Sequence, residues 1–120
     1  MVSIMIVEDV PELAELLQIM LERKEFTVPC VSHDGREALK LYQELGPKPD
    51  LVILDHRIPH KLGLEVGKEI RSINPVQKIL FLTADKSIQG QLEDHNFCNY
   101  LFKPVSFDQI FLTITNLFTS

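Results

Sequence analysis

Short apolar runs alternate with amphipathic stretches along the whole chain. Unbroken apolar runs such as 51–54 and 79–82 are typical of strands that are covered on both faces inside a parallel sheet. Between these runs, apolar residues recur at helical spacing and predict helices with one buried stripe. In the first helix, which opens at Pro11, the predicted buried stripe is Leu13, Leu16, Leu17 and Met20.

Local signals indicate where the elements begin and end. Asp34 with Glu37, and Ser106 with Gln109, have the spacing of capping boxes, which begin helices. Residues 85–96 are mostly polar and include Gly90, so we expect a short and weakly held helix there. The predicted strands are 3–7, 26–31, 51–54, 79–82 and 97–102, and a helix is expected after each of them.

The alternation of five strands and five helices predicts an α/β fold. Short connections indicate a doubly wound, five-stranded parallel sheet that forms one domain over residues 1–120. We expect this sheet to be flavodoxin-like, with strand order 2-1-3-4-5. Pro29 agrees with this order, because a proline cannot donate to a ladder and the second strand would lie at an edge. The first and third strands would flank the switch point, where ligands collect in such sheets.

Composition excludes several classes of protein. The formal net charge is -5, and no predicted element carries a cluster of lysine and arginine, which argues against nucleic-acid binding. Cys30 and Cys98 lie far apart inside predicted strands, so neither a disulfide framework nor a zinc site is expected. The amino terminus lacks the pattern of a signal peptide, and no apolar run approaches the roughly 20 residues that span a bilayer. We therefore expect a cytoplasmic protein without a membrane partner.

Polar side chains follow four of the predicted strands. Glu8 and Asp9 come after the first strand, Asp55 after the third, Thr83 after the fourth and Lys103 after the fifth. These residues should meet, because the carboxyl ends of parallel strands share one edge of the sheet. Three carboxylates in one crevice repel one another unless a cation is present. Mg²⁺ prefers such oxygen ligands, and Mn²⁺ would be an acceptable substitute.

The same crevice is suited to a phosphoryl group on Asp55. Pro59 forces the chain out of the sheet soon after this residue, which leaves the carboxylate at the strand end. A carboxylate can attack a phosphorylated donor and form an aspartyl phosphate. The hydroxyl of Thr83 and the ammonium of Lys103 would contact the remaining phosphoryl oxygens. The residues therefore predict covalent phosphorylation of Asp55.

Five motifs at suitable spacing strengthen this interpretation, since each is weak alone. They are the acidic pair in IVEDVPEL, the helix start DGREAL, LDHRIP followed by Gly63, the LTA triplet ending at Ala84, and YLFKP. From Ile4 to about Leu117, the chain resembles the receiver domain of two-component response regulators, of which the chemotaxis regulator is a familiar single-domain example.

The resemblance implies a function and a partner. Asp55 would accept a phosphoryl group from a histidine kinase or a histidine phosphotransfer protein. Asp9 would bind Mg²⁺ directly, Glu8 would act through water or as an outer partner, and the backbone carbonyl of Arg57 would complete the protein ligands. The chain would be a signalling module rather than an enzyme, catalysing only its own phosphoryl transfer and dephosphorylation.

The resemblance also implies a switch. Thr83, Ala84 and Lys103 would bind the phosphoryl group, and the bond between Lys103 and Pro104 is expected to be cis. Tyr100 occupies the switch position of the family and would turn inward when Thr83 moves toward the phosphoryl group. That movement would change the surface formed by the fourth helix, fifth strand and fifth helix, which would signal to a downstream partner or output domain.

Residues around the phosphorylation site invite two further predictions. Arg57 and Asp85 stand two residues after Asp55 and Thr83, and we expect an ion pair across the mouth of the site that hinders the attacking water. Alternatively, Arg57 points into solvent and Asp85 caps the fourth helix. His56 and His60 lie on either side of a proline and are expected to be exposed loop residues rather than metal ligands.

Two other functions remain open on the sequence alone. A small phosphatase or phosphotransferase acting on outside substrates through Asp55 would need a general acid two residues later, where Arg57 stands. A flavodoxin-like cofactor binder would need a phosphate-cradling loop after the first strand, where the acidic EDVPE stands. The sequence identifies neither the kinase nor the output, and leaves open whether the chain is part of a longer protein. It predicts no dimer, although surplus apolar residues on the last helix would allow one.

Overall fold

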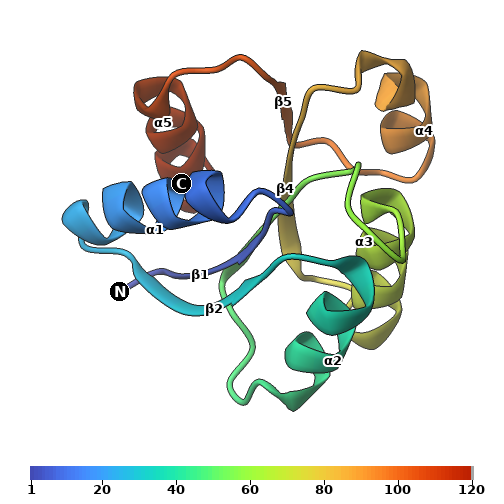
Figure 1. Cartoon of the computed structure of the whole chain (residues 1–120), viewed down its shortest axis with the longest axis horizontal. Coiled ribbons are helices and arrows are strands. Elements are labelled where there is room, and N and C mark those ends of the chain that lie inside the picture. Colours follow the sequence, from blue (N-terminus) through green and yellow to red (C-terminus); the bar gives the residue numbers. More distant parts are fainter. Residues whose placement is uncertain (120) are drawn as a thin grey trace.

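Five parallel strands form the centre of the protein in a computed structural model, which describes residues 1–119. Their order, β2-β1-β3-β4-β5, confirms the predicted flavodoxin-like topology (Figure 1). The strands are β1 (Ser3–Val7), β2 (Thr27–Ser32), β3 (Leu51–Leu54), β4 (Lys78–Thr83) and β5 (Tyr100–Phe102). The helices are α1 (Pro11–Arg23), α2 (Gly35–Glu44), α3 (Gly63–Ile73), α4 (Gln89–Asp94) and α5 (Phe107–Phe118), with a 3₁₀ turn η1 (Lys86–Ile88) before α4.

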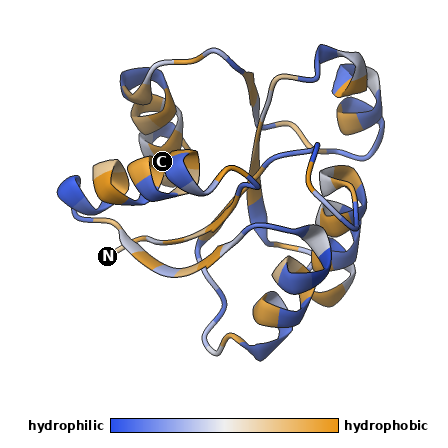
Figure 2. Ribbon diagram, in the orientation of Figure 1, coloured by the Kyte–Doolittle hydropathy of each residue, from blue (hydrophilic) through white to orange (hydrophobic). Residues whose placement is uncertain are grey.

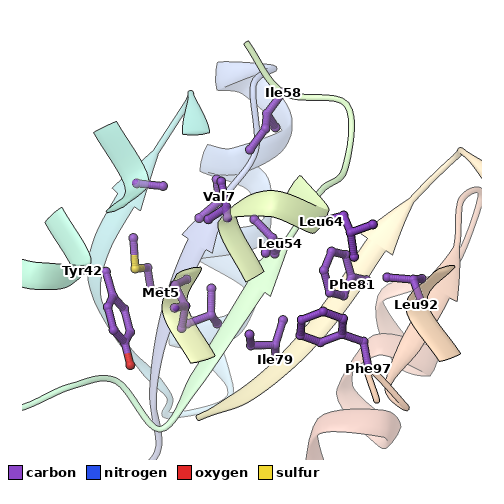
Figure 3. Packing of buried hydrophobic residues seen from close by; sticks show 14 of the residues in the cluster. Met5, Val7, Tyr42, Leu54, Ile58, Leu64, Ile79, Phe81, Leu92 and Phe97 are labelled. Atoms are coloured by element: carbon purple, nitrogen blue, oxygen red, sulfur yellow. The ribbon is translucent and has the colours of Figure 1, made fainter. Parts of the chain in front are cut away.

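Helices cover both faces of the sheet. In Figure 1, α1 and α5 lie on one side, and α2, α3 and α4 lie on the other. Side chains alternate along each strand, so Met5 and Val7 face the layer of α2 and α3, whereas Ile4 and Ile6 face α1 and α5. Every residue of β3 is buried, as expected for a strand covered on both faces. Figure 3 shows the larger of the two apolar clusters.

The predicted buried stripe of α1 is wrong in part. Leu13 and Leu16 are exposed, and the residues that α1 buries fully are Ala14 and Leu21. The small side chain of Ala14 fits where the helix meets the sheet, and Leu17 is half-buried beside it. Leucines therefore flank the contact rather than forming its centre, and part of the apolar face of α1 remains uncovered.

The fifth strand is shorter than the prediction of 97–102. The N–H of Phe97 donates to the carbonyl of Leu92, so this residue closes the end of α4 and is not part of the ladder. Its ring packs edge-on against Phe81, with ring centroids 5.1 Å apart (Figure 3). Cys98 was expected inside the strand, but it lies in the connecting loop and is exposed. The other four strands lie within one residue of their predicted ends.

Helix starts agree with the local signals. The carboxylate of Asp34 accepts the N–H of Glu37, and the hydroxyl of Ser106 accepts the N–H of Gln109. Helix α4 is short, as its sparse apolar pattern predicted. Figure 2 shows the strands mostly apolar and the helices of mixed character. Over residues 1–119, none of the helices has the length and apolar character needed to cross a bilayer.

Candidate functional site

Three carboxylates meet at the carboxyl edge of the sheet. Val7 of β1 pairs with Leu54 of β3, so the residues that follow them leave the sheet side by side. Each of Glu8, Asp9 and Asp55 offers an oxygen within 4.8 Å of the others. Glu8 and Asp55 are buried, whereas Asp9 is half-buried and more accessible to solvent. The sequence-predicted cluster is therefore present.

Lys103 brings a positive charge into this cluster from the end of β5. Its Nζ donates to Oε1 of Glu8 at 2.6 Å and to Oδ2 of Asp55 at 3.0 Å. Burial by itself would lower the pKa of Lys103, but the hydrogen bonds and charges of Glu8 and Asp55 outweigh burial and raise the pKa above its ordinary value. The lysine is thus held as a cation. The following bond, Lys103–Pro104, is cis, as the resemblance implied.

The donor set fits a hard divalent cation. One ammonium and three carboxylates leave negative charge uncompensated, and all the acidic ligand atoms are oxygens. Mg²⁺ is commonly held by one or two carboxylates together with waters and phosphate oxygens. The residues that could hold it are Glu8, Asp9 and Asp55, with the backbone carbonyl of Arg57 as a further oxygen.

The turn after β3 holds Asp55 at the end of the strand. Oδ1 of Asp55 accepts the N–H of His56 at 2.6 Å and lies 3.4 Å from the N of Arg57, while Oδ2 faces Lys103. Gly63, at the start of α3, lies directly against the backbone of Asp55. A Cβ at position 63 would lie 1.9 Å from the carbonyl oxygen of Asp55, so any larger residue would push the turn apart.

Thr83 and Ala84 end β4 at the same edge. Thr83 is buried, and its hydroxyl accepts the N–H of Asp85 at 3.1 Å. Among the hydrogen bonds of residues 1–119, none joins the Thr83 hydroxyl to Asp55. Ala84 is exposed. The backbone N–H of Lys103 donates to the carbonyl of Thr83, which ties the ends of β4 and β5 together.

Arg57 and Asp85 form the expected ion pair at the rim. Nη2 of Arg57 lies 3.0 Å from Oδ2 of Asp85, and the arginine side chain is 75% exposed whereas that of Asp85 is 9% exposed. Asp85 also accepts the N–H and the hydroxyl of Ser87, so it begins η1 as well. Hydrogen bonding from Ser87 lowers the pKa of Asp85, and the charge of Arg57 lowers this pKa further. The ion pair therefore forms together with a cap, but Asp85 caps η1 and not α4, whose N-cap residue is Ile88.

Tyr100 contacts α4 through its hydroxyl. The hydroxyl donates to the carboxylate of Glu93 and accepts from Nε2 of Gln89 at 3.0 Å. The hydrogen bond to Glu93 raises the pKa of Tyr100. Tyr100 is therefore linked to the shortest α-helix within residues 1–119.

His56 is buried, which contradicts the expectation of two exposed loop histidines. It is 7% exposed, and its Nδ1 accepts the N–H of Leu64 at 3.1 Å. Burial lowers the pKa of His56. His60 is exposed and lies 3.6 Å from a carboxylate oxygen of Asp34. The sequence contained one signal for this difference, because His56 stands only two residues after the last residue of a buried strand.

An apolar groove opens beside the carboxylates, between α1 and the segment that begins α5. It has a volume of about 440 Å³ and reaches Glu8 and Lys103 at one end. We call it the α1–α5 groove. Its apolar lining consists of Leu13, Leu16, Leu17, Met20, Leu82, Pro104, Val105, Phe107 and Ile110.

A parallel sheet with clustered carboxylates and a lysine at its carboxyl edge is the arrangement of a receiver domain. A family model described as the response regulator receiver domain matches residues 4–115, and the chain belongs to this family. Among curated relatives, the transcriptional regulatory protein TrcR of Mycobacterium tuberculosis is 29% identical, over 97% of this chain and 45% of that protein. The alkaline phosphatase synthesis transcriptional regulatory protein PhoP of Bacillus subtilis is 37% identical, over 85% of this chain and 43% of that protein.

The chain spans about half or less of the length of these relatives. A solved structure of the response regulator TrrA from Thermotoga maritima, in complex with Mg²⁺-BeF, is 33% identical with a TM-score of 0.87, covering 98% of this chain and 99% of that one. TrrA in complex with the histidine kinase ThkA is 32% identical with a TM-score of 0.84, covering 99% of this chain and 100% of that one. The similarity to full regulators thus concerns their receiver portion, a signalling module rather than a metabolic enzyme.

Proposed function

We propose that this receiver domain takes a phosphoryl group onto Asp55 from a histidine kinase or a histidine phosphotransfer protein, in the presence of Mg²⁺ or Mn²⁺. The observation that carries the proposal is the contact of Lys103 with both Asp55 and Glu8, beside the half-buried Asp9. We also propose that the protein is cytoplasmic, as expected from the sequence. We propose no substrate other than the domain itself, because the position two residues after Asp55 holds Arg57 and no general acid.

Phosphoryl transfer requires an oxygen nucleophile and neutralisation of the transferred charge. An oxygen of Asp55 forms a bond to phosphorus as the phosphorus–nitrogen bond of the donor phosphohistidine breaks, and the imidazole leaves. Lys103, held as a cation, turns from the carboxylates to a phosphoryl oxygen, and Thr83 and Ala84 border another. When bound by Asp9, Asp55 and the carbonyl of Arg57, with Glu8 as an outer partner, Mg²⁺ supplies further charge neutralisation.

The response to phosphorylation would pass through Thr83 and Tyr100. If the Thr83 hydroxyl turns to the phosphoryl group, it gives up its hydrogen bond from Asp85. Inward rotation of Tyr100 then breaks its contacts with Glu93 and Gln89 on α4. Helix α4 has only six residues and one fully buried side chain, Leu92, so its displacement costs few contacts. The surface of α4, β5 and α5 would then present a different face to a downstream partner or output domain.

Phosphorylation with a small donor tests the proposal directly. The protein is incubated with acetyl phosphate and MgCl₂, and the intact mass is measured before and after treatment with hydroxylamine, which cleaves acyl phosphates. We expect one added phosphoryl group that hydroxylamine removes. Rapid turnover of many donor equivalents per protein would favour the phosphatase or phosphotransferase alternative instead.

The α1–α5 groove is the proposed docking surface for the phosphohistidine partner. It adjoins Glu8 and Lys103, so a helix seated on its apolar lining would carry its histidine to the edge of the site. Leu16 is 56% exposed and lines the groove. We expect Leu16→Asp to slow phosphotransfer from a phosphorylated histidine protein by about tenfold, because a charge would be desolvated on docking.

The control for this prediction is Leu112→Asp on α5. Leu112 is 59% exposed and does not line the groove, so this variant should transfer at the wild-type rate. Both variants should react normally with acetyl phosphate, which needs no docking surface. Equal slowing of transfer in the two variants would count against the groove.

The rim pair should control how long the phosphoryl group lasts. Removing Arg57 opens the mouth of the site to water, and we expect Arg57→Ala to hydrolyse roughly tenfold faster than wild type. Decay of the phosphorylated protein in Mg²⁺ buffer is measured for Arg57→Ala, Asp85→Ala and the double variant, which completes a double-mutant cycle. Non-additive effects are expected because the two side chains contact each other. Identical decay in all four proteins would show that the pair does not control access of water.

A further inference from the structure

Helix α3 begins without a side-chain cap of the ordinary kind. Its N-cap residue is Leu62, which has no polar atom to accept the N–H groups of the first turn. Two of these groups donate to His56 instead. The N–H of Gly63 donates to the carbonyl of His56 at 2.8 Å, and the N–H of Leu64 donates to its Nδ1 at 3.1 Å.

The imidazole of His56 is therefore an acceptor in a buried place. Leu64 is 4% exposed and His56 is 7% exposed, so water has little access to the N–H of Leu64. An acceptor role at Nδ1 assigns the ring proton to Nε2. No other acceptor for this N–H is present among residues 1–119, and its loss would leave a buried donor unsatisfied.

The same residue organises the turn that carries the phosphoacceptor. The N–H of His56 donates to Oδ1 of Asp55, and its carbonyl also accepts the N–H of Ile58 at 3.1 Å. The start of α3 is pressed against Asp55, because a Cβ on Gly63 would overlap the carbonyl of Asp55. Movement of the helix start would therefore move both Asp55 and the backbone of Arg57.

We propose that His56 is a positioning residue whose ring caps α3 and thereby holds the turn 55–63 in the geometry that binds Mg²⁺ and accepts the phosphoryl group. Its effect on Mg²⁺ rests on the proposed function, whereas its capping of α3 does not. A residue that fills the same space without an acceptor would release the helix start and loosen the turn.

Four variants separate capping from packing. His56→Leu fills the space but accepts nothing, whereas His56→Asn carries an amide oxygen close to the place of Nδ1. Leu62→Ser supplies an ordinary N-cap hydroxyl, which accepts from the second or third amide of a helix, and Leu64 is the second amide of α3. The double variant His56→Leu/Leu62→Ser moves the cap from residue 56 to residue 62.

Hydrogen exchange of the Leu64 amide and Mg²⁺ affinity, both followed by NMR, are the readouts. In His56→Leu we expect the Leu64 amide to exchange about tenfold faster and the Kd for Mg²⁺ to rise about tenfold, the equivalent of about 1.4 kcal/mol. His56→Asn and the double variant should return both values toward those of the wild type. His95→Leu, at the exposed end of α4, is the matched control and should change neither.

Two results would overturn the inference. One is a His56→Leu variant with unchanged Leu64 exchange and unchanged Mg²⁺ affinity. The other is a double variant as impaired as His56→Leu, which would assign the effect to packing rather than to the cap. A wild-type protein that binds no Mg²⁺ would contradict the proposed function instead, and Leu64 exchange would still decide whether the ring caps α3.

Discussion

Replacing Asp55 with asparagine is expected to abolish phosphorylation by acetyl phosphate. The amide oxygen of asparagine is not an anionic nucleophile, so no bond to phosphorus forms at this position. The fold should be retained, because the amide oxygen can still accept the N–H of His56, and Lys103 keeps its contact with Glu8. Intact mass after incubation with acetyl phosphate and MgCl₂ measures the loss, and circular dichroism checks the fold.

Asp94→Asn is the matched control for this experiment. Asp94 is exposed at the end of α4, and the same chemical change there should leave phosphorylation at the wild-type level. If Asp55→Asn still gains one phosphoryl group as the wild type does, and peptide mapping finds it on a serine or a histidine, the assignment of Asp55 as phosphoacceptor is wrong.

Asp9→Ala is expected to weaken Mg²⁺ binding by about a hundredfold, measured by isothermal titration calorimetry. Asp9 is the most accessible of the three clustered carboxylates and is one of the proposed direct ligands. Within residues 1–119, its side chain takes part in no hydrogen bond or ion pair, so the metal-free protein loses no contact on substitution. Removal of one like charge also reduces repulsion in the cluster. The melting temperature without metal should therefore be unchanged or slightly higher.

Glu15→Ala separates ligation from general charge. Glu15 is exposed on α1, and its removal takes away one negative charge without removing a proposed ligand. Mg²⁺ affinity should be nearly unchanged in this variant. Wild-type affinity in Asp9→Ala, or equal losses in both variants, would argue that Asp9 does not bind the metal.

Several features of the fold and site could be predicted from local pattern. The run 51–54 is apolar at every position, and a strand with one face in water would expose half of these side chains. The run therefore indicates a strand buried on both faces. Once parallel strands are expected, their carboxyl ends must share an edge, and Glu8, Asp9 and Asp55 are brought together by topology alone. The caps of α2 and α5 were also predictable, because a cap joins residues only three positions apart.

Other features depended on contacts between distant parts of the chain. The rotation of α1, which exposes Leu13 and Leu16, follows from its fit against the sheet and α5, and no periodicity within α1 encodes that fit. Phe97 continues an apolar run in sequence, yet its ring packs against Phe81 and withdraws it from β5. A local pattern indicates which residues are apolar, but it does not indicate which distant residues will pack against them.

The sequence by itself determined the order of the elements, the residues at the strand ends and hence the set of groups at the site. The tertiary structure decided how those groups contact one another. Lys103 reaches Glu8 across 95 positions of sequence, and the buried His56 accepts the N–H of Leu64 at the start of α3. Such contacts depend on how close two elements lie and on which buried polar groups need a partner in place of water. Both are determined only when the chain has folded.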